Sequence, residues 1–534
     1  MQSAREAVKP LELGSERSRT ERRAREKHGV SKDADGNDRA NEWTATLDDL
    51  RDRRSAARAM GGEERLGKHR AAGKLDARAR IDHLFDKGSF QELGTLVGGA
   101  DSPADAVVMG SGRVDGRPVM VAAEDFTVKA GTISQAANSK RYRVAEIALL
   151  DRVPLVMILE GAGYRAEGGT HARTPTDLLA QGRCSGRVPL VTAVLGPSAG
   201  HGALVAPMSD FTVMSEQASI FTAGPPVVRE SLGESVTKEE LGGPSVALAS
   251  GLIHNVAAND CAALDIVRAY LRYFPSSAWS YPPDAVEGDT DARPVPEMID
   301  IVPRNGRRLY DMHAVIEVVF DRSSCFEVQP EFGKSVLCIL ARLGGHPVAV
   351  VANQPRVLAG SVDVDGADKA AHFITVADSF HLPLVFLADN PGVLPGRASE
   401  KRGILRSGAR MFAAQTLATV PKLHVTLRKA YGFGSMVMGM IGFDGQSSVF
   451  ALPGATLGAM GAAAMSRATG ADADTTERLH RVELETSYRS AGSLGFDELI
   501  DPREIRNVLL HALERALFRR QAAPAPVARV GILP

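Results

Sequence analysis

Residues 116–132, GRPVMVAAEDFTVKAGT, and residues 345–361, GHPVAVVANQPRVLAGS, are two versions of one block, and the second starts 345 − 116 = 229 residues after the first. A second block, PLVMILEG, recurs as PLVFLADN at the same offset, 383 − 154 = 229. A third block, VPLVTAVLGPSAGHG, recurs as VPKLHVTLRKAYGFG at an offset of 421 − 189 = 232. Three blocks that keep their order predict one domain that is present twice.

Short β-branched runs alternate with helical patterns in each copy. In the first copy the runs VVMGSGRV, PVMVAAEDF, PLVMILEG and PLVTAVLG flank the helical segment QAANSKRYRVAEIALLDR. This alternation predicts an α/β layer fold with partly parallel strands. Upstream, a Leu/Ala/Arg segment from Asn41 to Gly61-Gly62 has helical spacing, and KHRAAGKLDARARIDHLF predicts a second helical region. PREIRNVLLHALERALFRR predicts a helix near the C-terminus.

The composition along the chain predicts the domain boundaries. Residues 1–38 are charged and poor in large apolar residues, which is typical of a flexible tail. The Pro- and acid-rich stretch from Tyr281 to Glu297 predicts a linker. We therefore expect one domain at residues 39–294 and the other at 295–534.

The overall charge and the cysteines exclude several classes of protein. Lys and Arg number 63 against 64 Asp and Glu, for a net charge of −1, so no global basic field predicts nucleic acid or membrane binding. The four cysteines form no CxxC pair, which argues against a structural zinc site and a disulfide framework. The N-terminus lacks an apolar signal core, and no run of 18 apolar residues occurs. We expect a cytoplasmic protein.

Two motifs suggest other chemistry. GPSAG, at residues 196–200, fits a nucleophile elbow with Ser198 as the nucleophile, so a serine hydrolase is an alternative. Ala430 takes the serine position in the second copy, so the repeated feature is a glycine turn and not a hydroxyl. FGKS at residues 332–335 resembles the end of a phosphate-binding loop, but Val328 stands where that loop requires glycine.

The repeated feature is a pair of glycine turns, AGHG ending at Gly202 and YGFG ending at Gly434. Backbone N–H groups at such a strand-to-helix turn can stabilise an oxyanion or enolate. A second amide can come from the preceding strand end, in GAGY (161–164) and PGV (391–393). The alternative is that the glycines only permit close packing of strand and helix. His201 lies within the first turn and could act as an acid or base, but its counterpart is Phe433.

Basic residues precede and follow the first strands. The segment from Lys68 to Arg80, together with Lys140 and Arg141, could hold the phosphates of a nucleotide-like tail. The alternative is a solvated helix face.

The chain resembles the carboxyltransferase (β) subunits of biotin-dependent acyl-CoA carboxylases, such as propionyl-CoA and acetyl-CoA carboxylases, from about Asn41 to Pro534. The segments that carry the resemblance are FEVQPEFGKSVL, NPGVLPG, GILRSGARMFAAQTLATVPKLHVTLRKAYG, SDFTVMSEQASIFTAGPPVV and GESVTKEELGG. The family implies two crotonase-like domains of the ClpP/crotonase superfamily, assembled as a homohexamer. Its active sites lie where the acyl-CoA domain of one protomer faces the biotin domain of another.

The resemblance also implies roles for individual residues. Gly200, His201 and Gly202 would supply amides to the thioester oxygen, and Phe433 and Gly434 would supply them to the ureido oxygen of biotin. Further binding residues would be Gly163, Tyr164, Lys68, Arg70, Lys74 and Lys140 for acyl-CoA, and Gly392, Val393, Gly432 and Met436 for biotin.

In this family carboxybiotin releases CO2, the biotin enolate removes the α-proton of the thioester, and the resulting carbon nucleophile takes up CO2. The chain shows neither a Met-Lys-Met biotinylation signature nor an ATP-binding loop, so the resemblance implies a biotinylated biotin carboxylase/carrier (α) partner. A decarboxylase-type carboxyltransferase and a non-catalytic structural paralogue are alternatives.

The glycine turns differ from the sequences typical of the family. This chain has SAGHGA where the family has CAGGA, RKAYGFG where it has RKAYGGA, and EGAGYRAEGG where it has DSGGARIQEG. These bulkier side chains could reshape the pocket, and Met436 stands where relatives set their acyl-chain preference.

Overall fold

The computed structural model describes residues 34–99, 102, 104–165, 174–285, 288–306, 308–440, 445–518, 520 and 522–526, with the backbone alone for 34–42. The chain divides into two compact units, residues 1–56 and 57–534. Helix α2 (Ala34–Arg58) begins inside the expected flexible tail, and the remainder of that tail, residues 1–33, lies outside the described residues.

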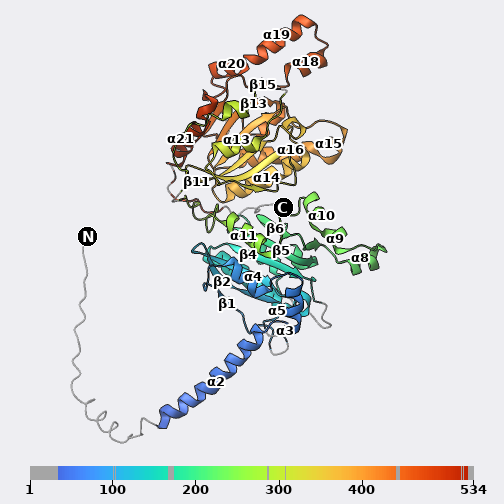
Figure 1. The fold of residues 1–534 in the computed structure, drawn as a ribbon, viewed down its shortest axis with the longest axis vertical. Helices are drawn as coiled ribbons and strands as arrows, with labels where there is room; N and C mark the ends of the chain where they lie inside the picture. The colour runs from blue at the N-terminus through green and yellow to red at the C-terminus, as the bar shows by residue number, and fades with distance from the viewer. Residues whose placement is uncertain are drawn as a thin grey trace, which may run out of the picture. The chain divides into compact units, whose positions relative to one another are not determined.

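The first copy forms a mixed sheet in the order β1-β2-β3-β4-β5-β6-β8, and β7 pairs with β5 (Figure 1, blue to green). Strands β1, β2 and β3 are antiparallel, and the strands from β3 onward are parallel. The strand bounds are β1 Gln91–Leu93, β2 Val107–Val114, β3 Arg117–Glu124, β4 Leu155–Gly161, β5 Leu190–Ala199, β6 Phe211–Ser215, β7 Ser219–Phe221 and β8 Asn255–Ala257.

The second copy repeats this sheet in the order β9-β10-β11-β12-β13-β14-β16, with β15 paired to β13. The bounds are β9 Phe326–Val328, β10 Val336–Leu343, β11 His346–Asn353, β12 Leu384–Asn390, β13 Lys422–Tyr431, β14 Ser448–Ala451, β15 Thr456–Gly458 and β16 Glu498–Leu499. Strands β10, β11 and β12 begin 229 residues after β2, β3 and β4, and β13 begins 232 residues after β5. The duplication predicted from the sequence blocks therefore extends to the ends of the strands.

Equivalent crossover helices connect the parallel strands. Helix α5 (Gln135–Asp151) joins β3 to β4, and α14 (Val364–Ser379) joins β11 to β12. Each follows a short 3-10 turn, η1 (Lys129–Gly131) or η2 (Leu358–Gly360). The side chains of Ser134 and Asp363 cap the helices by accepting backbone N–H bonds.

The expected helical region over residues 68–85 is two helices, α3 (Glu63–Ala71) and α4 (Ala77–Leu84). Gly73 between them has a φ of +77°, which a continuous helix does not allow. The Asp76 carboxylate then accepts bonds from the backbone N–H groups of Arg78 and Ala79 and starts the second helix.

The further helices are α6 Asp177–Cys184, α7 Gly200–Ala203, α8 Pro225–Leu232, α9 Lys238–Gly242, α10 Pro244–Ala249, α11 Asp260–Leu271, α12 Met298–Ile301, α13 Met312–Val319, α15 Arg397–Arg402, α16 Ile404–Leu417, α17 Gly432–Val437, α18 Ala462–Thr469, α19 Ala473–Leu484, α20 Thr486–Gly492, η3 Pro502–Glu504 and α21 Ile505–Leu517. Residues of both copies share one apolar core. Within it Phe211 stacks on Tyr270 at 4.3 Å between ring centroids and meets Phe326 of the second copy at 5.6 Å.

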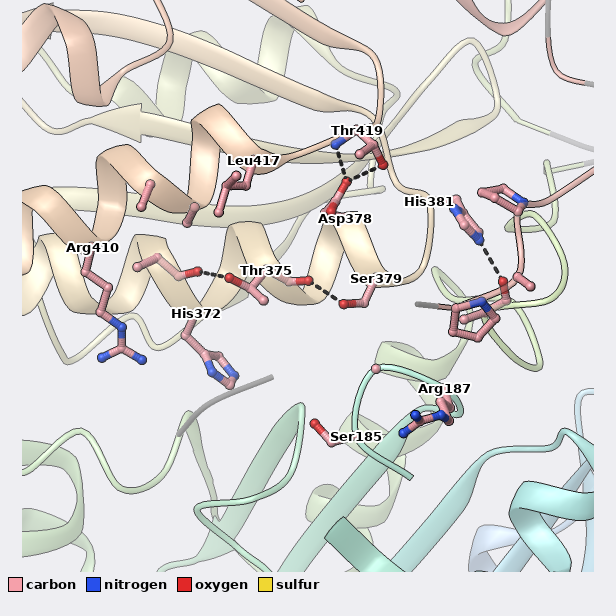
Figure 2. A pocket seen from close by; sticks show the side chains of 18 residues that line it. Ser185, Arg187, His372, Thr375, Asp378, Ser379, His381, Arg410, Leu417 and Thr419 are labelled. Atoms are coloured by element: carbon pink, nitrogen blue, oxygen red, sulfur yellow. Dashed lines mark hydrogen bonds between the residues drawn. The ribbon is translucent and has the colours of Figure 1, made fainter. Parts of the chain in front are cut away.

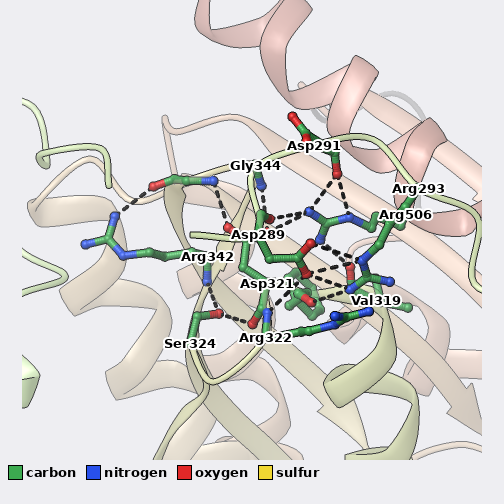
Figure 3. Close-up of polar contacts among 12 residues, drawn as sticks. Asp289, Asp291, Arg293, Val319, Asp321, Arg322, Ser324, Arg342, Gly344 and Arg506 are labelled. Carbon is green, nitrogen blue, oxygen red and sulfur yellow. Dashed lines mark hydrogen bonds and ion pairs between the residues drawn. The ribbon is translucent and has the colours of Figure 1, made fainter. Parts of the chain in front are cut away.

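A buried arginine ties the C-terminal helix to the second copy. Arg506 of α21 has a fully buried side chain and pairs with Asp321 at 2.8 Å (Figure 3). It also donates to the carbonyls of Val319, Asp289 and Asp291. The guanidinium therefore fixes the segment between the copies, the end of α13 and α21 to one another.

Candidate active site

The two glycine turns have the same backbone conformation. Strand β5 ends at Ala199 and α7 follows, and strand β13 ends at Tyr431 and α17 follows. The φ angle is +55° at Gly200 and +54° at Gly432, in the left-handed region that glycine adopts without strain. The first amides of each short helix have no carbonyl partner within that helix.

The preceding strand ends bring a second amide to each turn. Gly163 has a φ of +92°, and a Cβ there would lie 3.2 Å from the Ala199 carbonyl. Among the described residues, neither the N–H of Gly163 nor that of Val393 has a hydrogen-bond partner. The N–H of Gly392 is bonded to the Asn390 side chain at 3.1 Å. Val393, and not Gly392, is therefore the donor available in the second copy.

His201 turns its side chain toward helix α6. Its Nε2 lies 2.5 Å from a carboxylate oxygen of Asp177 and 3.3 Å from the Thr176 hydroxyl. Its ring meets that of Tyr164 edge-on at 6.2 Å. Burial opposes ionisation of Asp177, but Arg141, at 2.6 Å, and His201 outweigh it and lower the pKa of this carboxyl.

Phe433 occupies the equivalent space in the second copy. Its ring lies 6.0 Å from that of Phe412 on α16, and a Cβ on Gly408 of the same helix would lie 3.0 Å from it. Both bulky residues therefore pack against a neighbouring helix, by hydrogen bonds in one copy and by apolar contact in the other. This explains how the two glycine turns keep one conformation despite their different side chains.

A basic cavity of about 700 Å³ lies beside the first copy's strand ends. It is lined by Arg65, Lys68, His69, Ala72, Lys74, Phe126, Thr127, Lys129, Ala130, Glu160, Pro197 and Lys238. Two of the predicted cations, Lys68 and Lys74, therefore lie on one surface with further basic residues that the sequence did not single out.

The other predicted cations lie elsewhere. Arg70 pairs with Asp76 at 2.8 Å. Lys140 is fully buried and donates to the carbonyls of Ala104, at 2.8 Å, and Val107, and burial lowers its pKa to about 8. Arg141 is also fully buried, between Asp177 and Glu124. Lys140 and Arg141 therefore do not face a ligand, because carbonyls and carboxylates inside the domain already bind their charges.

A buried acid stands at the end of the same strand in both copies, and sequence reasoning missed it. Glu160 pairs with Lys74 at 2.7 Å and Arg80 at 2.6 Å, whereas Asp389 pairs with Arg428 at 2.7 Å. The repeat contained the signal, because Glu160 in PLVMILEG aligns with Asp389 in PLVFLADN at an offset of 389 − 160 = 229. These acids fix the strand ends from which the second amides extend.

The remaining candidates are placed as follows. Ser198 is 2% exposed and its hydroxyl donates to the Gly196 carbonyl at 3.3 Å, so its oxygen is not presented as a nucleophile. Met436 on α17 is 41% exposed. A separate cavity of about 600 Å³ is lined by Ser185 and Arg187 of the first copy and by His372, Thr375, Asp378 and Arg410 of the second (Figure 2). The residues singled out from the sequence do not line it.

None of the described helices is long and apolar enough to cross a membrane. Within the described part of the chain, no group of His, Cys, Asp and Glu side chains could hold a metal ion.

Comparison with known proteins identifies the family. Residues 68–530 match the model of the carboxyl transferase domain. The chain belongs to the carboxyltransferase family. The carboxyltransferase is 36% identical to the methylmalonyl-CoA carboxyltransferase 12S subunit of Propionibacterium freudenreichii subsp. shermanii, over 90% of this chain and 95% of that protein. It is 35% identical to the propionyl-CoA carboxylase carboxyltransferase subunit of Haloferax mediterranei, over 90% and 97%.

The carboxyltransferase also superposes on a solved structure of transcarboxylase 12S, with a TM-score of 0.83 and 35% identity over 91% of this chain and 98% of that one. That structure is described as a hexamer assembly with hydrolysed methylmalonyl-coenzyme A bound. The predicted resemblance to biotin-dependent acyl-CoA carboxyltransferases and the predicted pair of crotonase-like α/β domains are confirmed.

Proposed function

We propose that the carboxyltransferase is the subunit of an acyl-CoA carboxylase that moves CO2 from carboxybiotin to the α-carbon of an acyl-CoA, using backbone amides to stabilise the enolates. The observation that carries the proposal is the pair of glycine turns, with φ of +55° and +54°, at equivalent strand ends. Preorganised amides aimed at a developing oxyanion are worth about 100- to 1,000-fold in rate. Such a mechanism needs no acid or base that is repeated in both copies. This agrees with the sequence, because the position of His201 in the first copy is taken by Phe433 in the second.

The first copy, residues 39–294, would hold acyl-CoA. The thioester oxygen would accept bonds from the 200–202 turn and from Gly163, and Tyr164 would border the acyl group. The basic cavity would hold the phosphates through Lys68 and its other unburied cations, because it lies beside Pro197, three residues ahead of the turn. Arg70 and Lys140 drop out of this role because neither lines the cavity, and Lys74, which does, is already paired with Glu160.

The second copy, residues 295–534, would hold biotin. Biotin, delivered by a partner, supplies the carboxyl group. The 432–434 turn, with Phe433 and Gly434, and the N–H of Val393 would bind the ureido oxygen, and Gly392 would shape the approach. Met436, exposed beside this turn, would contact the acyl chain of the facing site.

The partner would be a biotinylated biotin carboxylase/carrier (α) subunit, and the assembly would be a cytoplasmic homohexamer. Propionyl-CoA is the first substrate to test, because the relatives include propionyl-CoA and methylmalonyl-CoA enzymes. Acetyl-CoA and longer chains belong in the same test.

The experiment combines the full chain with a biotinylated partner, ATP, labelled bicarbonate and acyl-CoAs from two carbons upward, and follows fixed label. Gly200→Ala and Gly432→Ala should each slow fixation, because a side chain at these left-handed positions strains the turn, and the loss should be larger for Gly432→Ala, whose Cβ would lie 2.9 Å from the Ala459 carbonyl oxygen. Gly470→Ala is the matched control, since its φ is +62° and no atom lies within 4 Å of the added Cβ. An intact complex without turnover on any substrate would refute the proposal and favour the structural paralogue. Net CO2 release from a malonyl-type thioester, without fixation, would favour the decarboxylase.

A further inference from the structure

We propose that His201 and Asp177 form an acid–base pair that lets this chain exchange the α-proton of bound acyl-CoA with water in the absence of the biotinylated partner. The inference rests on the proposed function, because it requires acyl-CoA at the first glycine turn. It adds a side-chain activity to one half-site only.

The asymmetry between the copies is the starting observation. Phe433 fills the space beside α16 by apolar contact alone. A phenylalanine therefore satisfies the packing requirement of this position in the second copy, whereas His201 makes a polar contact with Asp177 in the first. The difference falls in the copy that would hold the thioester, which is the substrate with an acidic carbon-bound proton.

The hydrogen bonds of His201 fix the ring as a base. Nε2 is bonded to Asp177, and among the described residues Nδ1 has no hydrogen-bond partner. Asp177 is fully buried and also accepts bonds from Arg141, at 2.6 Å, and Gln181, at 2.9 Å. A carboxylate that accepts the proton of one ring nitrogen leaves the lone pair on the other, as in Ser-His-Asp triads.

The ring also lies where a proton transfer would be useful. His201 belongs to the first glycine turn, and its ring contacts that of Tyr164, which follows the end of the neighbouring strand β4. Its side chain is 24% exposed, so part of it is accessible to a ligand. A thioester whose oxygen is bound by these amides has its α-carbon one bond from the carbonyl carbon, close to the same ring.

The reaction is balanced without a further reactant. Nδ1 takes the α-proton, the C–H electron pair moves into the enolate, and the turn amides stabilise its oxygen. The imidazolium exchanges its proton with water and returns a solvent proton to the α-carbon. The thioester bond stays intact and nothing is oxidised or reduced.

The test follows deuterium incorporation into propionyl-CoA by NMR, with the full chain in D2O and without partner, biotin or ATP. Rates are compared at saturating thioester, after its binding has been measured by calorimetry. We expect the α-position to exchange, and His201→Phe, which copies the second half-site, to slow exchange by at least about 100-fold. His201→Gly should recover part of the rate when imidazole is added, which a purely structural role would not produce.

Two results would overturn the inference alone: propionyl-CoA that binds without exchanging, or exchange that persists in His201→Phe. A chain that binds none of the acyl-CoAs would overturn the proposed function as well. Thermal unfolding and the mass of the assembly confirm that each variant has folded.

Discussion

Gly434→Ala should disable the second half-site, whereas the equivalent change in the first copy, Gly202→Ala, should be mild. A Cβ on Gly434 would lie 2.1 Å from the Asn390 side-chain oxygen and 2.6 Å from the Cα of Gly392. A Cβ on Gly202 would lie 3.0 Å from the terminal methyl of Ile133. The first clash involves backbone, whereas the second involves the end of the Ile133 side chain and, at 3.2 Å, a carboxylate oxygen of Glu124.

The size of the effect follows from these distances. An ordinary contact needs about 3.4 Å, so the Gly392 turn must move by about 0.8 Å from Gly434→Ala, and the Ile133 methyl by about 0.4 Å from Gly202→Ala. A misplacement of about 1 Å at a reacting centre costs about 100-fold in rate. Overpacking adds about 1–3 kcal/mol of destabilisation. We therefore expect about a 100-fold loss of carboxyl transfer for Gly434→Ala and a few-fold loss for Gly202→Ala.

The assay is carboxylation of propionyl-CoA in the reconstituted complex, with unfolding curves for both variants. Propionyl-CoA binding to the isolated chain separates the half-sites, because Gly434→Ala should leave it within a factor of about two. Equal activity of the two variants, or a Gly434→Ala enzyme within a few-fold of the parent, would refute the geometric reasoning.

Three further variants test the stability of the fold. Burial raises the pKa of Asp210 to about 8, so the folded state loses stability as pH rises from about 4 to 8. The slope is at most about 1.4 kcal/mol per pH unit, and Asp210→Asn should remove it. Denaturant titrations at several pH values measure this. The hydrogen bond that His313 donates to the Glu327 carboxylate is the main factor that raises the pKa of His313 to about 9. His313→Gln should therefore cost up to about 1 kcal/mol of stability below pH 6.5 and nothing above about pH 10, by the same measurement. Arg506→Met leaves the buried Asp321 carboxylate unpaired and should cost about 3–5 kcal/mol in urea unfolding; a loss under 1 kcal/mol would contradict this.

The sequence predicted the strands and turns well because local pattern determines them. PLVMIL is a continuous apolar run, and β4 is buried along its whole length, as expected of a parallel strand with both faces covered. Gly200 and Gly432 mark turns that require a left-handed backbone conformation, so the glycines in the local motif were enough to locate these turns. The repetition of both features in the second copy made the prediction specific.

The orientation of charged side chains could not be predicted in the same way. Lys140 lies in a polar stretch of α5 that is typical of a solvated face, but its ammonium binds carbonyls more than thirty residues earlier in the chain. His201 and Asp177 are 24 residues apart, and only the packing of α6 against the turn joins them. Such contacts depend on tertiary structure, which neither periodicity nor spacing encodes.

The acids at the ends of β4 and β12 draw their counter-charges from different parts of the chain, so the two copies differ in how each can be truncated. Asp389 on β12 pairs with Arg428 on β13, so the neighbouring strand of the same sheet neutralises its charge. Glu160 depends on Lys74 and Arg80, which precede the first strand of its sheet. A fragment of the first copy cut at that strand would carry an unpaired buried carboxylate, at a cost of several kcal/mol. Any truncated or recombined version of this domain must therefore begin upstream of α4, whereas the second copy carries its own neutralising charge.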